Sequence, residues 1–234
     1  MANVARRPRQ AQSLSQGRQA RYDRCMSARI ITGPDDLAEG AGWLATRDVR
    51  LAPVLAACGP LPLRRVPPGF GALVDAVAGQ QVSTASARAI LGRLRAAGLD
   101  RAETIRQAPD EALRACGLSR PKTRTLRALS EATPDFGAIA RMPEHEAVAA
   151  LVALPGIGRW TAEIYLMFAE GRADVFAAGD LALQEAARIA FDLPARPREA
   201  DLRALAEEWR PWRAVAARAL WAYYRLVKSR EGVA

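Results

Sequence analysis

The sequence predicts an all-α protein of roughly ten short helices, and three observations support this class. Apolar residues repeat at helical spacing, as in Leu73, Val74 and Val77. Proline and acidic residues recur together where a first helical turn favours them. Alternating β-branched runs typical of strands are missing, apart from the short segment Arg29-Ile30-Ile31-Thr32.

Each predicted helix begins where a capping residue or a proline precedes an apolar repeat. Further helices are predicted over 144–153, about 160–169 and 181–190. A dense Pro and Gly break over 59–69 separates a first helical part from a second that begins near Phe70. The start signals are Gly33-Pro34-Asp35-Asp36, Asp48 as a cap, Pro109-Asp110-Glu111, Ser119-Arg120-Pro121 and Met142-Pro143-Glu144.

Length and composition are those of an ordinary soluble globular protein. The chain has 234 residues, 50% of them hydrophobic and 25% charged. This length is sufficient to bury a hydrophobic core without disulfides or structural metals. It has neither an apolar stretch of membrane-span length nor an apolar signal core, so we expect a cytoplasmic protein without membrane contact. Three cysteines without close spacing and a single histidine, His145, exclude a disulfide framework, an iron–sulfur cluster and a His-based metal site.

The net charge of +9 is unevenly distributed along the chain. Residues 1–29 hold seven arginines and one acid, and we interpret them as a flexible basic arm or a cloning remnant. The remaining residues carry only +3, so global charge says little about the folded part. Only Lys122 and Lys228 are lysines, and the arginine excess fits either codon usage or phosphate contacts.

The most informative motif is Leu154-Pro155-Gly156-Ile157-Gly158-Arg159-Trp160-Thr161-Ala162, which lies between two predicted helices. Two glycines one residue apart, directly before a helix, allow a tight hairpin whose amide N–H groups are exposed to a partner. This geometry suits a phosphate, although a plain turn between two helices would also account for the glycines.

The string Leu-Pro-Gly-Ile-Gly-x-x-Thr-Ala resembles the helix-hairpin-helix element of DNA repair glycosylases, which grips the DNA backbone without reading sequence. Further motifs resemble the DNA-3-methyladenine glycosylase II branch, and the resemblance covers roughly residues 45–228. These motifs are Phe70-Gly71-Ala72-Leu73-Val74, Gly79-Gln80-Gln81-Val82-Ser83, Gly117-Leu118-Ser119-Arg120-Pro121-Lys122 and Trp209-Arg210-Pro211-Trp212-Arg213.

The resemblance implies a catalytic carboxylate at Asp180, which follows Trp160 by 20 residues as in that branch. Cleavage of the glycosidic bond leaves an oxocarbenium-like sugar, which a nearby carboxylate stabilises, or for which it orients the attacking water. Asp180 also precedes the helix predicted over 181–190, so an N-cap role is the alternative. Asp174 is close in sequence, and we interpret it as structural.

The resemblance also implies a base pocket with aromatic walls at Trp160 and Trp221. An alkylated base is cationic and electron-poor, so aromatic faces suit it. Ile164 and Leu181 stand where some members have Tyr, which predicts a more aliphatic pocket. We interpret the remaining tryptophans as packing residues, namely Trp43, Trp209 and Trp212.

The resemblance also implies which residues contact DNA. The hairpin residues Gly156, Ile157, Gly158, Arg159 and Thr161 would grip the DNA backbone. The loop after the Phe70 helix would insert a wedge into the minor groove, and an amide such as Gln81 can fill the gap left by a flipped base. Gln81 ending a helix is the alternative. The wedge residues are Gln80, Gln81, Val82 and Ser83, and family members often hold Na⁺ or K⁺ through carbonyls that map to Val152, Leu154 and Ile157.

The expected activity is that of a monofunctional DNA glycosylase that needs no catalytic cofactor. Bifunctional relatives carry a Schiff-base Lys where this chain has Trp160, and Lys122 and Lys228 lie outside the motif. Two alternatives stay open: a bifunctional glycosylase/lyase for oxidised bases, and a non-enzymatic DNA-binding module that uses the hairpin alone.

The architecture implied is two helical lobes with the active site in the cleft between them. One lobe spans 70–174 and contains the helix-hairpin-helix at about 144–169. The other is discontinuous and joins 30–69 to 175–230. We expect the compact form without the family's N-terminal β domain, and a monomer whose partner is double-stranded DNA with alkylated bases.

Overall fold

The structure is a computed structural model that describes residues 29–132 and 134–231. Within these ranges it contains thirteen α-helices and no strand, which confirms the all-α prediction. The strand-like segment near residue 30 forms only an isolated bridge between Ile30 and Arg172. The helices are α2 (Pro34–Arg47), α3 (Leu51–Cys58), α4 (Phe70–Gly79), α5 (Thr84–Ala96), α6 (Ala102–Gln107), α7 (Asp110–Ala115), α8 (Arg120–Ala132), α9 (Phe136–Arg141), α10 (Glu144–Val152), α11 (Arg159–Tyr165), α12 (Leu181–Ala190), α13 (Glu199–Ala206) and α14 (Arg213–Glu231), with a π-helix η1 (Leu166–Glu170) and a 3₁₀ turn η2 (Glu207–Trp209).

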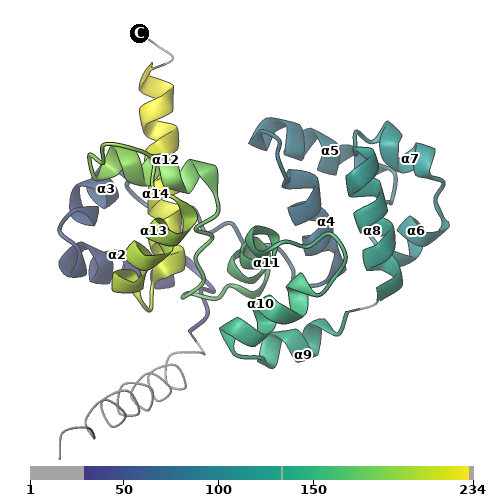
Figure 1. The fold of residues 1–234 in the computed structure, drawn as a ribbon, viewed down its shortest axis with the longest axis horizontal. Coiled ribbons are helices and arrows are strands. Elements are labelled where there is room, and N and C mark those ends of the chain that lie inside the picture. The colour runs from purple at the N-terminus through teal and green to yellow at the C-terminus, as the bar shows by residue number, and fades with distance from the viewer. Residues whose placement is uncertain (1–28, 133, 232–234) are drawn as a thin grey trace, which may run out of the picture.

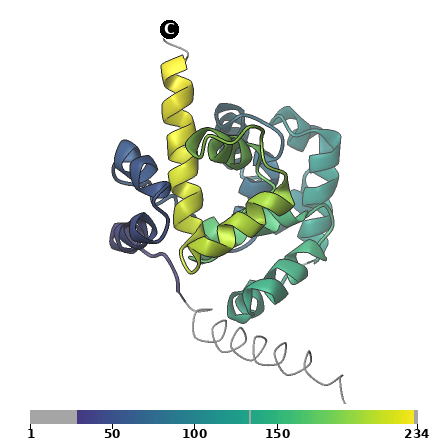
Figure 2. The same ribbon diagram turned by 60° about the vertical axis from the view of Figure 1, so that its left-hand side comes forward.

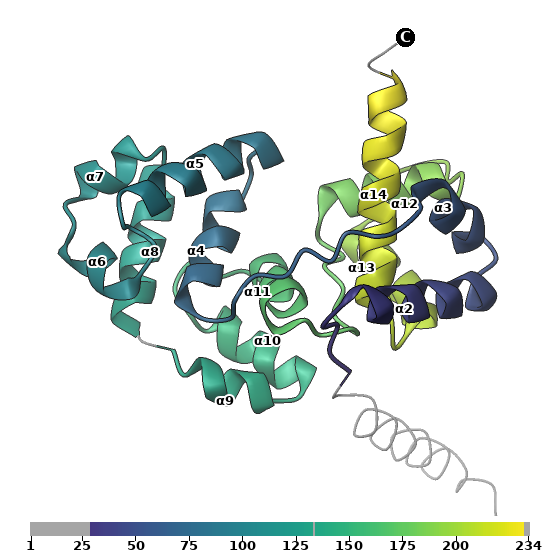
Figure 3. The same cartoon turned by 180° about the vertical axis from the view of Figure 1, so that it is seen from behind.

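The helices form two groups with α11 between them (Figure 1). One group contains α2, α3, α12, α13 and α14, and the other contains α4 to α10. The linker between α3 and α4 runs across the back of the molecule, past α14 and α11 (Figure 3). The long helix α14 stands upright beside α2 and α3 (Figure 2), so segments from both ends of the described chain build one lobe.

Local sequence signals explain most helix starts. Gly33 is the N-cap of α2 with Pro34 in the first turn, and Asp36 accepts hydrogen bonds from the Thr32 and Gly33 N–H groups. The predicted helix starts at Pro109 and Pro143 are confirmed, although each proline is the N-cap of α7 or α10 and not a first-turn residue. The helices α4 and α12 begin at the predicted residues as well.

The prediction that Asp48 is the N-cap of a helix is wrong, because α3 begins at Leu51 and its N-cap is Arg50. The Asp48 carboxylate accepts the Arg50 backbone N–H at 3.0 Å, its guanidinium at 2.7 and 2.9 Å, and the Trp209 Nε1–H at 2.9 Å. The hydrogen bonds from Arg50, and secondly that from Trp209, lower the pKa of Asp48 to about 2 against the opposing effect of burial. Asp48 therefore ties the α2–α3 turn to the C-terminal part of the chain.

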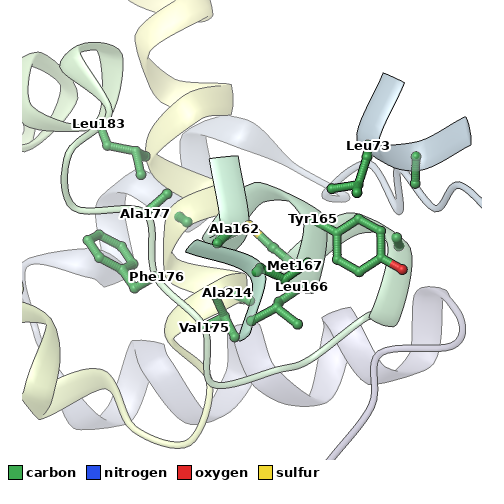
Figure 4. Packing of buried hydrophobic residues seen from close by; sticks show 14 of the residues in the cluster. Leu73, Ala162, Tyr165, Leu166, Met167, Val175, Phe176, Ala177, Leu183 and Ala214 are labelled. Carbon is green, nitrogen blue, oxygen red and sulfur yellow. The ribbon is translucent and has the colours of Figure 1, made fainter. Parts of the chain in front are cut away.

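The α11–η1 segment is embedded in the core (Figure 4). Tyr165, Leu166 and Met167 are each at most 1% exposed and pack with Val175 and Ala214, among others. The buried side chains fix the helix that follows the glycine hairpin, so the hairpin is presented from a rigid base.

The basic arm predicted over 1–29 lies outside the described residues, except for its last member. Arg29 pairs with Glu39, and its guanidinium lies 4.3 Å from the centroid of the Trp212 ring. Arg29 therefore belongs to the folded part, which corrects its assignment to a flexible arm. In the part of the chain that the structure describes, no helix combines the length and apolar character needed to cross a bilayer.

Candidate functional site

Asp180 is held by three hydrogen bonds from groups far apart in the sequence. It is the N-cap of α12, where its Oδ1 accepts the Leu183 N–H at 2.9 Å. The same oxygen accepts the Trp221 Nε1–H at 3.1 Å, and Oδ2 accepts the Trp160 Nε1–H at 3.0 Å. The capping role and the approach to both indoles therefore coexist in one side chain.

The carboxylate has acceptor capacity left. An ionised carboxylate offers about four lone-pair positions, and the three donors leave one of them at Oδ2. Asp180 is partly exposed and lines a cavity of about 690 Å³. The other lining residues come from the loop after α4, the hairpin and the start of α12, namely Gly79, Gln80, Gln81, Val82, Ser83, Gly158, Trp160, Thr161, Gly179, Leu181 and Ala182.

The predicted wedge residues face this cavity with Asp180, but two of them are bound internally. Gln80 donates from Nε2 to Thr161 Oγ1 at 2.9 Å. Ser83 is the N-cap of α5, and its hydroxyl accepts the Ser86 N–H at 3.1 Å. These two hydrogen bonds hold the loop in place, and Gln81, Val82 and Ser83 are all exposed. The wedge role of the four residues stays a prediction.

Gln81 adopts a left-handed backbone with φ of 54°. It follows Gln80, whose φ of −59° and ψ of 130° match the first central residue of a type II turn. The second central position of that turn is usually glycine, and a side chain there costs about 1–2 kcal/mol. Gln81 is thus strained at the cavity, where strain often accompanies function.

Lys122 stabilises the backbone of the same loop. Its Nζ donates to the carbonyls of Ala78 at 2.9 Å and Gln80 at 2.7 Å, at the end of α4. Burial lowers the pKa of Lys122. Sequence analysis missed this role, and the only available signal was the rarity of lysine in the chain.

The two glycines of the hairpin between α10 and α11 differ, because only Gly156 has a conformation and surroundings that require glycine. Gly156 has φ of 73°, and a Cβ there would lie 2.1 Å from Thr125 Oγ1. Gly158 is the N-cap of α11 and has open space around it. The Ile157 side chain is 4% exposed and anchors the hairpin, so a DNA contact at this residue would use its backbone.

Arg159 and Thr161 occupy different environments on α11. The Arg159 side chain is 57% exposed and donates from Nε to Glu163 Oε1 at 2.9 Å. Thr161 is 2% exposed and its hydroxyl is bound to Gln80, so its side chain supports the wedge loop instead of facing DNA. Only the backbone N–H of Thr161, in the first turn of α11, remains for a phosphate.

Glu163 forms a buried ion network behind the Asp180 loop. Its carboxylate is 3% exposed, and Oε1 accepts from Arg203 at 2.8 Å as well as from Arg159. Arg203 also donates to the Phe176 carbonyl at 3.4 Å and to Glu199 at 2.8 Å. This network joins α11, α13 and the loop that leads to Asp180. Sequence reasoning missed it, although the i to i+4 spacing of Arg159 and Glu163 was a weak signal.

The two tryptophans predicted to line the base pocket, Trp160 and Trp221, have different surroundings. Trp160 lines the cavity with Asp180, and Trp221 is absent from the lining residues. The Trp221 ring stacks on Phe168 at 5.7 Å between centroids, so one of its faces is already covered. Leu181 is 63% exposed at the cavity, while Ile164 lines a second cavity one turn further along α11. An aromatic sandwich around a base stays a prediction.

The remaining candidates are structural or untested. Asp174 accepts from Arg213 at 2.8 Å and pairs with Arg210 at 2.9 Å, and it is absent from the cavity lining. The described residues contain no cluster of three His, Cys, Asp or Glu side chains that could hold a metal. The carbonyls predicted to bind Na⁺ or K⁺ lie around the α10–α11 turn, and that of Leu154 also accepts the Ile157 N–H at 3.2 Å.

Comparisons with known proteins give the relatives of this chain. The family model described as "HhH-GPD superfamily base excision DNA repair protein" matches residues 74–211. DNA-3-methyladenine glycosylase 1 of Schizosaccharomyces pombe is 34% identical over 158 residues, which are 64% of this chain and 69% of that protein. The structure of the 3-methyladenine DNA glycosylase of this yeast in complex with abasic DNA aligns with a TM-score of 0.73 and 29% identity, covering 78% of this chain and 95% of that one. A DNA-3-methyladenine glycosidase of Bacillus halodurans aligns with a TM-score of 0.68 and 29% identity, covering 86% and 94%.

Proposed function

Because the chain belongs to the HhH-GPD superfamily of base excision DNA repair proteins, we propose that its cavity receives an alkylated base from duplex DNA and that Asp180 supports hydrolysis of the N-glycosidic bond. The protein is a monofunctional DNA glycosylase of the 3-methyladenine and 7-methylguanine type, and it leaves an abasic site. The observation that carries this proposal is the Asp180 carboxylate, which is fixed by two indole N–H groups and keeps one acceptor position beside the hairpin cavity.

The positive charge of the alkylated base explains how the N-glycosidic bond breaks. Alkylation at a ring nitrogen makes the base cationic, so the C1′–N bond breaks with its electron pair going to the base, which departs neutral. The sugar is left as an oxocarbenium ion, and the negative charge of Asp180 stabilises it. Water then adds to C1′ and loses a proton, which leaves the abasic sugar. The remaining lone pair on Asp180 Oδ2 can accept a hydrogen bond from that water.

Access to the base requires a flipped nucleotide, which costs a few kcal/mol. Gln81 is the exposed, strained tip of the loop that borders the cavity, and its amide can fill the vacated stack. Gln80 and Lys122 hold the loop from behind. The wedge role of Gln81 is part of the proposal.

The hairpin would grip the strand through its backbone. The amides of the first turn of α11 and the exposed Arg159 side chain suit a DNA phosphate. A monovalent cation would be held by the carbonyls of Val152, Leu154 and Ile157 and would add positive charge toward the same phosphate.

The test uses duplex DNA methylated with a simple alkylating agent. We expect the protein to release methylated purines, identified by chromatography, and to leave intact strands at abasic sites. Borohydride is expected to trap no covalent adduct, because Trp160 stands where a Schiff-base lysine would be needed and Lys122 is bound to two carbonyls. Binding to DNA without release of any base would leave only the hairpin module, and a trapped adduct would indicate a lyase.

A further inference from the structure

A second cavity, of about 420 Å³, lies between the α3–α4 linker, α4, α5 and the α11–η1 segment. It shares no lining residue with the Asp180 cavity. Four arginines line it, and Asp75 is the acidic residue among them. Asp75 already accepts two hydrogen bonds from Arg95 at 2.7 and 2.8 Å. Arg64, Arg65 and Arg88 therefore line the cavity with no carboxylate bound to them among the described residues.

These cations come from two segments on either side of α4. Arg64 and Arg65 lie on the linker that crosses the back of the molecule (Figure 3), and Arg88 lies on α5. Arg64 has φ of 47°, a left-handed conformation that disfavours a long side chain. Burial, followed by the charges of Arg225 on α14 and Arg88, lowers the pKa of Arg64. Arginines of the linker and of α5 thus line one cavity, and the charge of Arg225 on α14 acts on Arg64 without lining it.

Arg218 adds a buried charge behind the cavity. It is 1% exposed and donates only to carbonyls, those of Ala214 at 2.9 Å and Met167 at 3.2 Å, and its Nε has no partner. Its guanidinium lies 4.8 Å from the centroid of Phe168, which lines the cavity. Burial, and then the charges of Arg65 and Arg64, lower the pKa of Arg218 to about 10. Like charges assembled this way are stabilised by an anion.

We propose that this cavity binds a phosphate group between Arg64 and Arg88. Guanidinium groups match the geometry of phosphate oxygens and form charge-assisted hydrogen bonds with them. A neutral ligand would leave the mutual repulsion of the arginines in place, whereas a phosphate offsets it.

The rest of the cavity indicates what carries the phosphate. Ile164, Phe168 and Leu91 give it an apolar wall, and the volume exceeds that of a phosphate alone. The sugar or base of a nucleotide fits this wall. The phosphate therefore belongs either to a bound DNA strand or to a free nucleotide or inorganic phosphate, and the two sources are separated by experiment.

The first arm uses inorganic phosphate, titrated by calorimetry at constant ionic strength. We expect the wild type to bind it and the Arg64→Ala and Arg88→Ala variants to bind at least about tenfold more weakly, because a charge-assisted hydrogen bond is lost. Arg64 and Arg88 are both exposed, so both variants are expected to fold. Arg114→Ala removes an exposed charge on α7 in the same lobe and serves as the matched control.

The second arm measures binding of undamaged duplex DNA as a function of salt. If the phosphate belongs to DNA, each variant reduces the slope of log K against log salt by about 0.9, which corresponds to one phosphate contact. If only inorganic phosphate responds, the source is a free ligand. The proposal is overturned if neither probe responds to the two variants, or if Arg114→Ala changes both to the same extent. Neither measurement depends on base excision, so the outcome for this cavity is independent of the outcome for the proposed glycosylase activity.

Discussion

At the scale of single residues, the function depends on how Asp180 is oriented. Its two oxygens are fixed by donors from α11, α12 and α14. The spacing between Trp160 and Asp180 could be predicted from the sequence, because the motif and the carboxylate are carried by one short segment. The indole N–H contacts could not, because α14 reaches Asp180 only through the packing of the whole lobe.

Trp221→Phe isolates the effect of one of these donors. Phenylalanine keeps the stack on Phe168 and removes the hydrogen bond to Asp180. A hydrogen bond to a charged group contributes about 1.5–3 kcal/mol, so we expect excision under single-turnover conditions to slow by about tenfold or more. Binding of abasic DNA is expected to stay unchanged. An excision rate equal to that of the wild type would show that Trp221 does not orient the carboxylate.

Gln81 allows a second test at the residue scale, because one substitution relieves its backbone strain, another keeps it, and both remove the side-chain amide. Gln81→Gly relieves the left-handed strain of about 1–2 kcal/mol but increases the entropy of the unfolded chain, so stability is expected to change little. Gln81→Ala keeps the strain. Both variants lose the amide, and we expect both to lose activity on duplex DNA while keeping it on a single strand, where no stack needs filling. Equal losses on the two substrates would argue against a wedge.

At the scale of elements, helix boundaries were predictable where capping is local. Pro34, Pro109 and Pro143 begin helices through their own backbone preferences. The π-helix η1 could not be predicted, because the same residues fit a regular α-helix and the register is set by core contacts of Tyr165 and Met167. Asp48 is similar, since its partner Trp209 is 161 residues away.

Asp48 makes stability depend on pH. Its pKa is about 2 in the folded state, below its ordinary value near 3.8, so its charge stabilises the fold fully above pH 4. This contribution, about 2 kcal/mol, is lost as pH falls from 4 to 2. Asp48→Asn keeps the size of the side chain and removes the charge, so we expect the difference in free energy of unfolding between wild type and variant to disappear over that range. Urea denaturation at several pH values measures it, and a difference that is constant with pH would contradict the account.

The Glu163 network supports the loop that carries Asp180. Arg203→Met keeps the aliphatic stem and leaves the buried Glu163 with Arg159 alone. Removing one partner of a buried pair costs about 3–5 kcal/mol, so we expect a large drop in the urea midpoint. Arg198→Met removes an exposed partner of Asp201 on the same lobe and is expected to leave the midpoint unchanged. Equal midpoints for Arg203→Met and the wild type would mean that the network is not stabilising.

At the scale of the whole molecule, the fold class followed from periodicity and capping, and the arrangement in two lobes followed from the family resemblance. Which residues line each cavity could not be predicted from the sequence. The arginines of the second cavity lie on a linker and a helix that meet only in the folded chain, and nothing in their local sequence distinguishes them from the many exposed arginines.

The central claim is that Asp180 acts on the sugar while the rest of the site holds the DNA. Single-turnover excision from methylated duplex DNA by Asp180→Asn tests it directly, with abasic-DNA binding measured alongside. Asparagine still caps α12, so we expect normal folding and binding, with excision reduced by about 100-fold or more. Excision at the wild-type rate by a variant that binds and folds normally would contradict the account.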